Sequence, residues 1–417
     1  MTKKDVAELK SRFKKSSCTF TKISGCYVNG SKEILVRFTD TFLNLEDEEF
    51  FKYLEIAKKT LSGTLGNNLL EVPFPDSETE TSTGQQFLLG LRESKLKNEE
   101  LTDTFFQQII EQYQYVGNYL ILIFHDAYDV MVKTSDQNKL DESEEVYEYL
   151  LCSICPVSLT KPGLGYLEGE QKIGARYRDW VVQVPETGFL FPAFTDRSSD
   201  IHSCLFYTRD ILEPHNEIVT EILGCKTRPT GALQKQVFEN IIKRAVSDEE
   251  QSMELFSEIQ ESFKEIVDEK KEKEELELSS PEEQLLLTKD SILEILAEKE
   301  VEQELVEKIE QLYEETFSDQ VPQIEHLLDK KVLQENESKK TTKILMEQIH
   351  DLEEKVKEYK DQNDSEKYDV VVKVSAEKVQ QISTAMVDGK KCIVIPLEEY
   401  EQVRINDQTE FEQMQEG

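Results

Sequence analysis

Residues 118–126 read Asn-Tyr-Leu-Ile-Leu-Ile-Phe-His-Asp, and residues 146–155 read Val-Tyr-Glu-Tyr-Leu-Leu-Cys-Ser-Ile-Cys. The first stretch is a short, continuous apolar run between Gly117 and polar residues, which is typical of a buried strand. The second stretch returns after a polar, acidic loop at 133–145 that contains no convincing crossover helix. We therefore expect the two strands to pair antiparallel at the centre of the fold.

Further elements surround this pair. Asn29-Gly30, a dipeptide that suits a tight hairpin turn, separates the strand-like residues 23–28 and 33–38. The periodicity predicts helices over 46–61, 85–91 and 98–113, strands over 180–184, 188–194 and 201–208, and an exposed loop over 72–84. The predicted fold class is α+β, with a mostly antiparallel sheet and flanking helices on one side of it.

The composition changes at about residue 240. Of 36 aromatic residues, 28 precede residue 241, and the net charge of −36 divides into −11 for residues 1–240 and −25 for residues 241–417. The pattern predicts a globular α+β domain over 1–231 and an acidic helical region with a charged linker over 232–366. A small β-rich unit over 367–405, with a strand at 370–374 and a hairpin turn at 386–390, and a disordered tail over 406–417 complete the expected chain.

Charge and hydropathy exclude several classes of partner. A pI near 4.6 disfavours nucleic-acid binding by the molecule as a whole. A basic amphipathic helix at the N-terminus is expected to pack on its own domain, and contact with nucleic acid or an anionic membrane is the alternative. No apolar run is long enough to span a membrane, and no secretory signal pattern is present. Seven irregularly spaced cysteines fit a reducing compartment, so we expect a cytoplasmic protein.

The C-terminal region is the expected place for a protein partner or a second copy. Leu345, Ile349, Leu352, Val356 and Tyr359 keep a 4-3-4-3 spacing, although about two heptads are fewer than a convincing coiled coil needs. The β-rich unit is too small to bury much core alone, so we expect it to dock or to dimerise.

Two cysteines have the spacing of a metal or redox pair. Cys152 and Cys155 are separated by two residues, but no second pair with that spacing exists, and the two lie within an apolar strand. Buried structural thiols are the favoured interpretation, with a metal site and a redox pair as the alternatives.

His125-Asp126 resembles the His-Asp pair of metal-dependent phosphohydrolases. Those pairs sit on helices, whereas this pair ends a predicted strand, where Asp126 would begin a turn. A functional role remains the second interpretation, because sites often gather at strand ends.

Asp196, Arg197, Asp200 and His202 form the densest polar cluster. Two carboxylates, a guanidinium and an imidazole within seven positions suit a metal, a phosphate or a general base. The alternative is a turn between strands, with Asp and Ser side chains capping backbone amides and Arg197 paired with a neighbouring carboxylate. Signatures of nucleotide-binding loops, Rossmann folds, serine hydrolases and zinc proteases are missing from the sequence, and we expect no cofactor.

Several of these motifs together resemble a bacterial family, the domain-of-unknown-function family 4317. They are Ser24-Gly-Cys-Tyr27, His125-Asp-Ala-Tyr-Asp-Val130, Leu151–Ser158, Gly188–Phe194, Asp196–His202, Val387-Asp-Gly389 and Ile393–Pro396. The resemblance spans nearly the whole chain and implies one bacterial cytosolic protein, but no activity. Two hypotheses follow: a non-enzymatic interaction or regulatory module, or a metal-dependent hydrolase that cleaves a phosphoester at residues 196–202.

Overall fold

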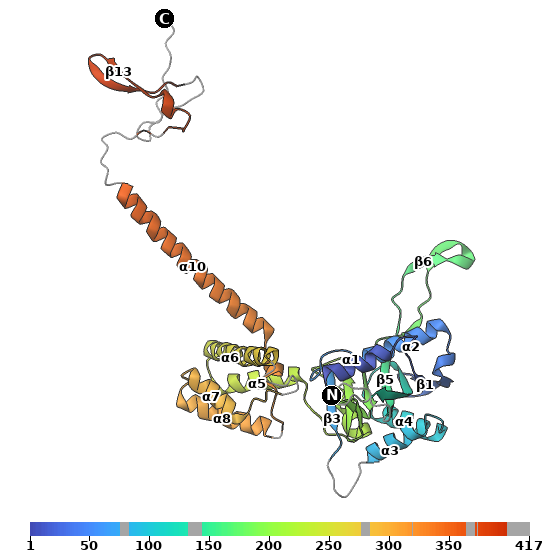
Figure 1. Cartoon of the computed structure of the whole chain (residues 1–417). Helices are drawn as coiled ribbons and strands as arrows, with labels where there is room; N and C mark the ends of the chain where they lie inside the picture. Colours follow the sequence, from blue (N-terminus) through green and yellow to red (C-terminus); the bar gives the residue numbers. More distant parts are fainter. Residues whose placement is uncertain are drawn as a thin grey trace. The chain divides into compact units, whose positions relative to one another are not determined.

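The computed structural model describes residues 1–75, 83–131, 144–276, 284–318, 320–363, 372 and 374–397 (Figure 1). Its contacts divide the chain into two compact units, Met1–Glu337 and Ser338–Gly417. No helix among the described residues is both long and apolar enough to cross a membrane.

An eight-stranded sheet forms the centre of the first unit. Its order is β2 (Ile34–Thr41), β1 (Phe20–Val28), β4 (Asn118–Met131), β5 (Glu144–Leu159), β9 (Thr187–Phe191), β12 (Ser203–Thr208) and β3 (Leu69–Pro73), with β8 (Trp180–Val182) also paired to β5. All neighbouring strands in this sheet run antiparallel. The predicted pairing of the two apolar stretches is confirmed, since β4 and β5 are in register from Asn118 opposite Val157 to Met131 opposite Glu144.

Helices cover both faces of this sheet, whereas the sequence predicted helices on one side. On one face, α1 (Lys3–Arg12) and α2 (Asp47–Thr60) pack on a core that includes Leu122 and Phe124 of β4. On the other, α3 (Thr83–Glu93), α4 (Glu99–Gln112) and the π-helix η3 (Ile218–Leu223) pack on Ile121 and Ile123. A strand buried on both faces has no polar alternation, which explains the continuous apolar run in β4.

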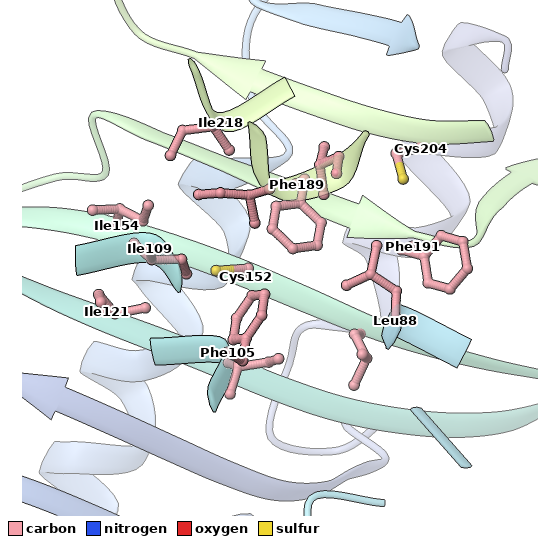
Figure 2. Close-up of a cluster of buried hydrophobic side chains, with 14 of the residues drawn as sticks. Leu88, Phe105, Ile109, Ile121, Cys152, Ile154, Phe189, Phe191, Cys204 and Ile218 are labelled. Carbon is pink, nitrogen blue, oxygen red and sulfur yellow. The ribbon is translucent and has the colours of Figure 1, made fainter. Parts of the chain in front are cut away.

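Figure 2 shows the core beneath α4. Phe105 and Ile109 of α4 lie over Ile121 of β4, and over Cys152 and Ile154 of β5. Every one of these side chains is fully buried. Aromatic and branched aliphatic side chains therefore pack against the central strands on both faces of the sheet.

Three local predictions differ from the structure. Residues 69–73 form the edge strand β3, which pairs with β12, so the predicted loop at 72–84 begins too early. The turn between β1 and β2 is longer than two residues: Lys32 takes the positive φ of 62°, and the Asn29 side chain accepts from the Ser31 and Glu33 amides. A hairpin of β6 (Leu164–Leu167), η2 (Glu168–Glu170) and β7 (Lys172–Ala175) was not predicted at all.

A helical region follows the sheet in the first unit. Helices α5 (Gly231–Ala245), α6 (Glu249–Glu275), α7 (Lys289–Glu298), α8 (Gln303–Phe317) and α9 (Ile324–Leu327) share a separate core. Hydrogen bonds from the Gly231 amide to the Gly66 carbonyl (2.7 Å) and from the Ala232 amide to the Asn67 side chain (2.8 Å) join it to the sheet. The domain boundaries at 231 and 366 stay predictions.

The second unit contains most of α10 (Lys330–Asn363) and a small hairpin. Strands β13 (Ser383–Val387) and β14 (Lys390–Val394) pair through Asp388-Gly389, whose φ angles of 51° and 77° suit a two-residue turn. The predicted hairpin at this position is confirmed. Most of the predicted strand 370–374, and the whole tail 406–417, lie outside the described residues.

Candidate functional site

The predicted cluster at residues 196–202 forms a small hairpin and a capped turn. Strands β10 (Ala193–Thr195) and β11 (Ser198–Asp200) pair through Asp196 and Arg197, which take positive φ angles of 50° and 61°. Asp196 is exposed at this turn. The Arg197 guanidinium lies 3.1 Å from the Glu8 carboxylate of α1. The turn interpretation predicted that Arg197 would pair with Asp196 or Asp200 instead, and that part of it is wrong.

Asp200 and Arg197 have different partners, and the side chains of Asp200, His202 and Arg197 do not converge on one site. One Asp200 oxygen accepts from the His202 backbone amide at 2.9 Å, and the other accepts from the Ser203 hydroxyl. The His202 side chain is exposed. Across the described parts of the chain, no three His, Cys, Asp or Glu side chains lie close enough to hold one metal ion.

The cysteine pair lies on opposite faces of the sheet. Side chains alternate along a strand, so residues three apart point in opposite directions. Cys152 belongs to the core under α3 and α4, and Cys155 belongs to the core under α1 and α2. The two thiols of this motif therefore cannot bind one metal or form a disulfide with each other while β5 is intact.

His125 and Asp126 also point to opposite faces, because they are neighbours inside β4. The strand continues to Met131, so the turn expected at Asp126 does not occur there. Asp126 is buried and accepts from the Tyr149 hydroxyl at 2.7 Å and from the Ala127 amide at 2.9 Å. Burial raises the pKa of this carboxyl despite those hydrogen bonds.

His125 is the centre of a hydrogen-bonded chain of side chains. Its Nδ1 lies 2.6 Å from the Thr21 hydroxyl, and its Nε2 lies 2.9 Å from Glu148 Oε1. The Lys95 ammonium is 3.6 Å from the same carboxylate oxygen. Burial lowers the pKa of the imidazole, and the hydrogen bond to Glu148 opposes this effect only in part.

Sequence reasoning selected His125 but missed its three neighbours. Thr21 and Lys95 come from different elements, and no spacing in the sequence links either of them to His125. Glu148 was within reach, because the antiparallel pairing of β4 with β5 places it opposite Ala127. The available signal was Glu148, the one charged residue in the run Val146–Cys155, placed between Tyr147 and Tyr149.

Two open hollows adjoin each other at one end of the sheet, away from these residues. The larger, of about 440 Å³, is lined by residues that include Tyr115, Gln183, Glu186, Arg209 and His215. The smaller, of about 380 Å³, shares Glu186 and Arg209 with it. Two lining side chains already have partners: Arg209 pairs with Glu186 at 2.5 Å, and His215 Nδ1 lies 2.8 Å from Glu217 Oε1. None of the residues predicted from the sequence lines either hollow.

Comparison with known proteins yields one family. A search of curated proteins finds no match to the chain. A family model described as Domain of unknown function (DUF4317) matches residues 1–407, which is nearly the whole chain and agrees with the resemblance seen in the motifs. The protein therefore belongs to the DUF4317 family.

Proposed function

We propose that this protein is an interaction or regulatory protein whose copies associate in pairs through helix α10. The observation that carries the proposal is an apolar stripe on α10, made of Leu345, Ile349, Leu352 and Val356. Their exposed fractions are 52%, 56%, 60% and 53%. Single exposed apolar residues are ordinary, but four at alternating spacings of four and three share one face of the helix.

The residue types in the α10 stripe favour a second copy of α10 as the occupant. In heptad terms, Ile349 and Val356 occupy the a positions, and Leu345 and Leu352 occupy the d positions. Branched Ile or Val at a with Leu at d favours parallel, two-stranded coiled coils. Packing these knobs against a copy of the same stripe would remove all four side chains from water.

The small hairpin supports the same proposal. Met386 and Val387 of β13, and Ile393 and Val394 of β14, remain exposed, although all four are apolar. An isolated two-stranded hairpin is only marginally stable in water. Bringing two copies together through the α10 stripe would raise the local concentration of two such hairpins, which would help them pack.

Salt separates self-association from binding to a basic partner. Residues 241–417 carry a net charge of −25, so two copies repel each other. Salt screens this repulsion, and association through the α10 stripe should strengthen as ionic strength rises. Binding to a basic partner, such as a nucleic-acid-associated protein, should weaken under the same change.

Sedimentation equilibrium of the full chain tests the proposal. The wild type should show a concentration-dependent dimer, and the double variant Ile349→Ser, Leu352→Ser should be monomeric. The matched control is Ile344→Ser, because Ile344 is equally exposed on α10 but lies off the stripe. A wild type that is monomeric at every concentration, or a control variant that loses the dimer equally, would contradict the proposal.

The hydrolase hypothesis stays a prediction. Metal analysis of the purified protein, together with a phosphatase screen of wild type and Asp200→Ala, tests it. Since Asp200 accepts hydrogen bonds within its own turn, we expect the Asp200→Ala variant to change turn stability and not phosphoester cleavage.

A further inference from the structure

The hydrogen-bonded side chains Thr21, His125 and Glu148 are connected in the order hydroxyl, imidazole, carboxylate, which is the order that activates a hydroxyl as a nucleophile. A neutral imidazole has one N–H and one free lone pair. An ionised carboxylate can only accept, so with Glu148 ionised the Nε2 atom carries the hydrogen in the 2.9 Å contact. Nδ1 is then the acceptor for the Thr21 hydroxyl at 2.6 Å, and the His125 backbone carbonyl oxygen, at 3.2 Å, is a second and longer acceptor for the same hydroxyl.

A β-bulge brings Thr21 to this position. Phe20 pairs with Asp126 and Lys22 with His125, so Thr21 has no partner of its own on β4. Phe20 and Ile23 both lie in the core under α1 and α2, although regular alternation would place residues three apart on opposite faces. The extra residue turns the Thr21 side chain toward His125, on the other face of the sheet.

Exposure differs sharply along this chain. The His125 side chain is fully buried, Glu148 is one-quarter exposed, and Thr21 is exposed to solvent. A buried histidine that served packing alone would need only buried partners. Here the buried imidazole has a partly exposed carboxylate on one nitrogen and an exposed threonine hydroxyl on the other, so a small molecule in solvent can reach that hydroxyl.

A second unusual feature lies beside Glu148. Lys95 and Leu96 both have φ angles of 52°, in the left-handed region that residues other than glycine rarely adopt. Leu96 is buried in the core under α3 and α4, which holds this backbone in place. Lys95 is thereby fixed near the carboxylate that orients the imidazole, and strained backbone of this kind gathers at functional sites.

We infer that Thr21 and His125, oriented by Glu148, form an acyl-transfer site that takes acyl groups from small activated esters. The inference is independent of association through α10. Thr21 supplies the nucleophile and His125 the general base, while Glu148 is a positioning residue that holds the required tautomer. The pattern is hydroxyl, imidazole and carboxylate in hydrogen-bonded order.

The reaction balances with groups that the site holds. The Thr21 oxygen forms a bond to the acyl carbon while its proton passes to His125 Nδ1. The bond from that carbon to the leaving oxygen then breaks, and the imidazolium returns the proton to the leaving alkoxide. The products are acyl-Thr21 and an alcohol or phenol. Water, activated by the same imidazole, can later release a carboxylic acid and restore Thr21.

The full chain treated with p-nitrophenyl acetate provides the test, followed by peptide mass spectrometry. Acetyl should appear on Thr21. The initial rate of p-nitrophenolate release should be at least about tenfold lower in Thr21→Val than in wild type, since a general base accelerates such a reaction roughly a hundredfold or more. Thr21→Ser should retain the reaction. Lys22 is next in sequence, so the measurements use a Lys22→Arg background to separate amine acetylation from hydroxyl acetylation.

Thr39→Val is the matched control. Thr39 is an exposed threonine of the same sheet whose hydroxyl meets the Ser24 hydroxyl at 2.9 Å and no imidazole. It should show wild-type release. Equal release from wild type and Thr21→Val, or no acetyl on Thr21 in the wild type, would overturn the inference. The decisive variant changes an exposed residue and leaves the buried His125 and its contact with Glu148 in place.

The pH profile distinguishes chemistry from structure. The charged groups that act on His125 are Glu148 on β5 and Lys95 after α3, together with Asp126, its neighbour on the opposite face of β4. Because burial lowers the pKa of His125 below its ordinary 6.5, the acylation rate should reach half its maximum below pH 6.5. Glu148→Gln removes a charge that raises this pKa, so the midpoint should move lower still. An unchanged midpoint in Glu148→Gln, together with an unchanged rate, would contradict the assigned role of Glu148.

Discussion

Two glycines with opposite surroundings give a test of packing at the residue scale. A Cβ on Gly188 of β9 would collide with the backbone carbonyl of Cys152 and would lie 2.7 Å from the Thr60 methyl group. A Cβ on Gly90 of α3 would meet nothing within 4 Å. Gly188→Ala should lower the free energy of unfolding by about 1–3 kcal/mol through overpacking. Gly90→Ala should raise it by about 0.5–1 kcal/mol through helix propensity.

Urea unfolding of both glycine variants checks this pair of predictions. Gly90→Ala is the control for Gly188→Ala, since the added methyl group is the same in both. Destabilisation of similar size in both variants would mean that the close approach of β9 to β5 is wrong.

His125 also makes stability depend on pH. Its pKa is lowered by burial in the folded chain and has its ordinary value of 6.5 when unfolded. Below pH 6.5 the unfolded chain therefore binds more protons than the folded chain. The contribution of His125 to the free energy of unfolding is complete above pH 6.5 and is lost as the pH falls through the lowered pKa. Burial lowers the pKa of His326 as well, so both histidines contribute.

Denaturant unfolding between about pH 7 and about pH 5 measures this dependence. His125→Gln should be less stable than wild type at pH 7, because Glu148 and Thr21 lose a buried partner, and its stability should fall less on acidification. His350→Gln is the control, since the His350 side chain is 74% exposed. A His125→Gln variant with the wild-type pH slope would contradict the burial of an uncharged imidazole.

At the scale of elements, the strand pattern makes a prediction about the cysteines. Five of the seven are buried: Cys26, Cys152, Cys155, Cys204 and Cys225. Burial also raises the pKa of the half-buried Cys18 to about 11, which leaves little thiolate near neutral pH. In the native protein, a thiol reagent should label Cys392 first, Cys18 more slowly, and the other five only on unfolding.

Mass spectrometry of the labelled peptides over time tests that order. Denatured protein, in which all seven thiols should react, is the control. Rapid native labelling of Cys152 or Cys155 would show that β5 opens easily, and would restore the metal or redox interpretation of that motif.

Element by element, the sequence predicted what local pattern controls. The apolar runs of β4 and β5 were enough for an antiparallel pair, and the Asp388-Gly389 turn was enough for the last hairpin. Helices α3 and α4 were predicted, but their place on the second face of the sheet was not, because helical periodicity marks an apolar stripe and does not tell which face of the sheet that stripe covers. The β6–β7 hairpin was missed because Leu164, Tyr166 and Ile173 are exposed, so burial does not impose a pattern there.

The candidate site shows the same limit more strongly. His125 is recognisable in the sequence because the His125-Asp126 pair resembles a metal-binding His-Asp pair and follows an apolar run. Thr21 is 104 residues away and reaches it only through a bulge, and Lys95 reaches Glu148 only through two left-handed residues. Bulges and left-handed residues are set by tertiary packing, and neither has a reliable sequence signal without glycine or asparagine.

For the whole molecule, charge and packing are separated along the chain. The large aromatic cores lie in the sheet, whereas the excess negative charge lies after residue 240. Self-association through a charged region requires apolar contact strong enough to exceed repulsion. In the proposed dimer, the α10 stripe supplies that apolar contact.

Cysteine cross-linking at the α10 stripe tests this central proposal most directly. In a parallel two-stranded coiled coil, each d residue faces the same residue of the other copy. With Cys18 and Cys392 replaced by serine, Leu352→Cys should form a covalent dimer on mild oxidation, and Ile344→Cys, which lies off the stripe, should not. The account predicts strong cross-linking at 352 alone. Equal cross-linking at both positions, or none at 352, would contradict it.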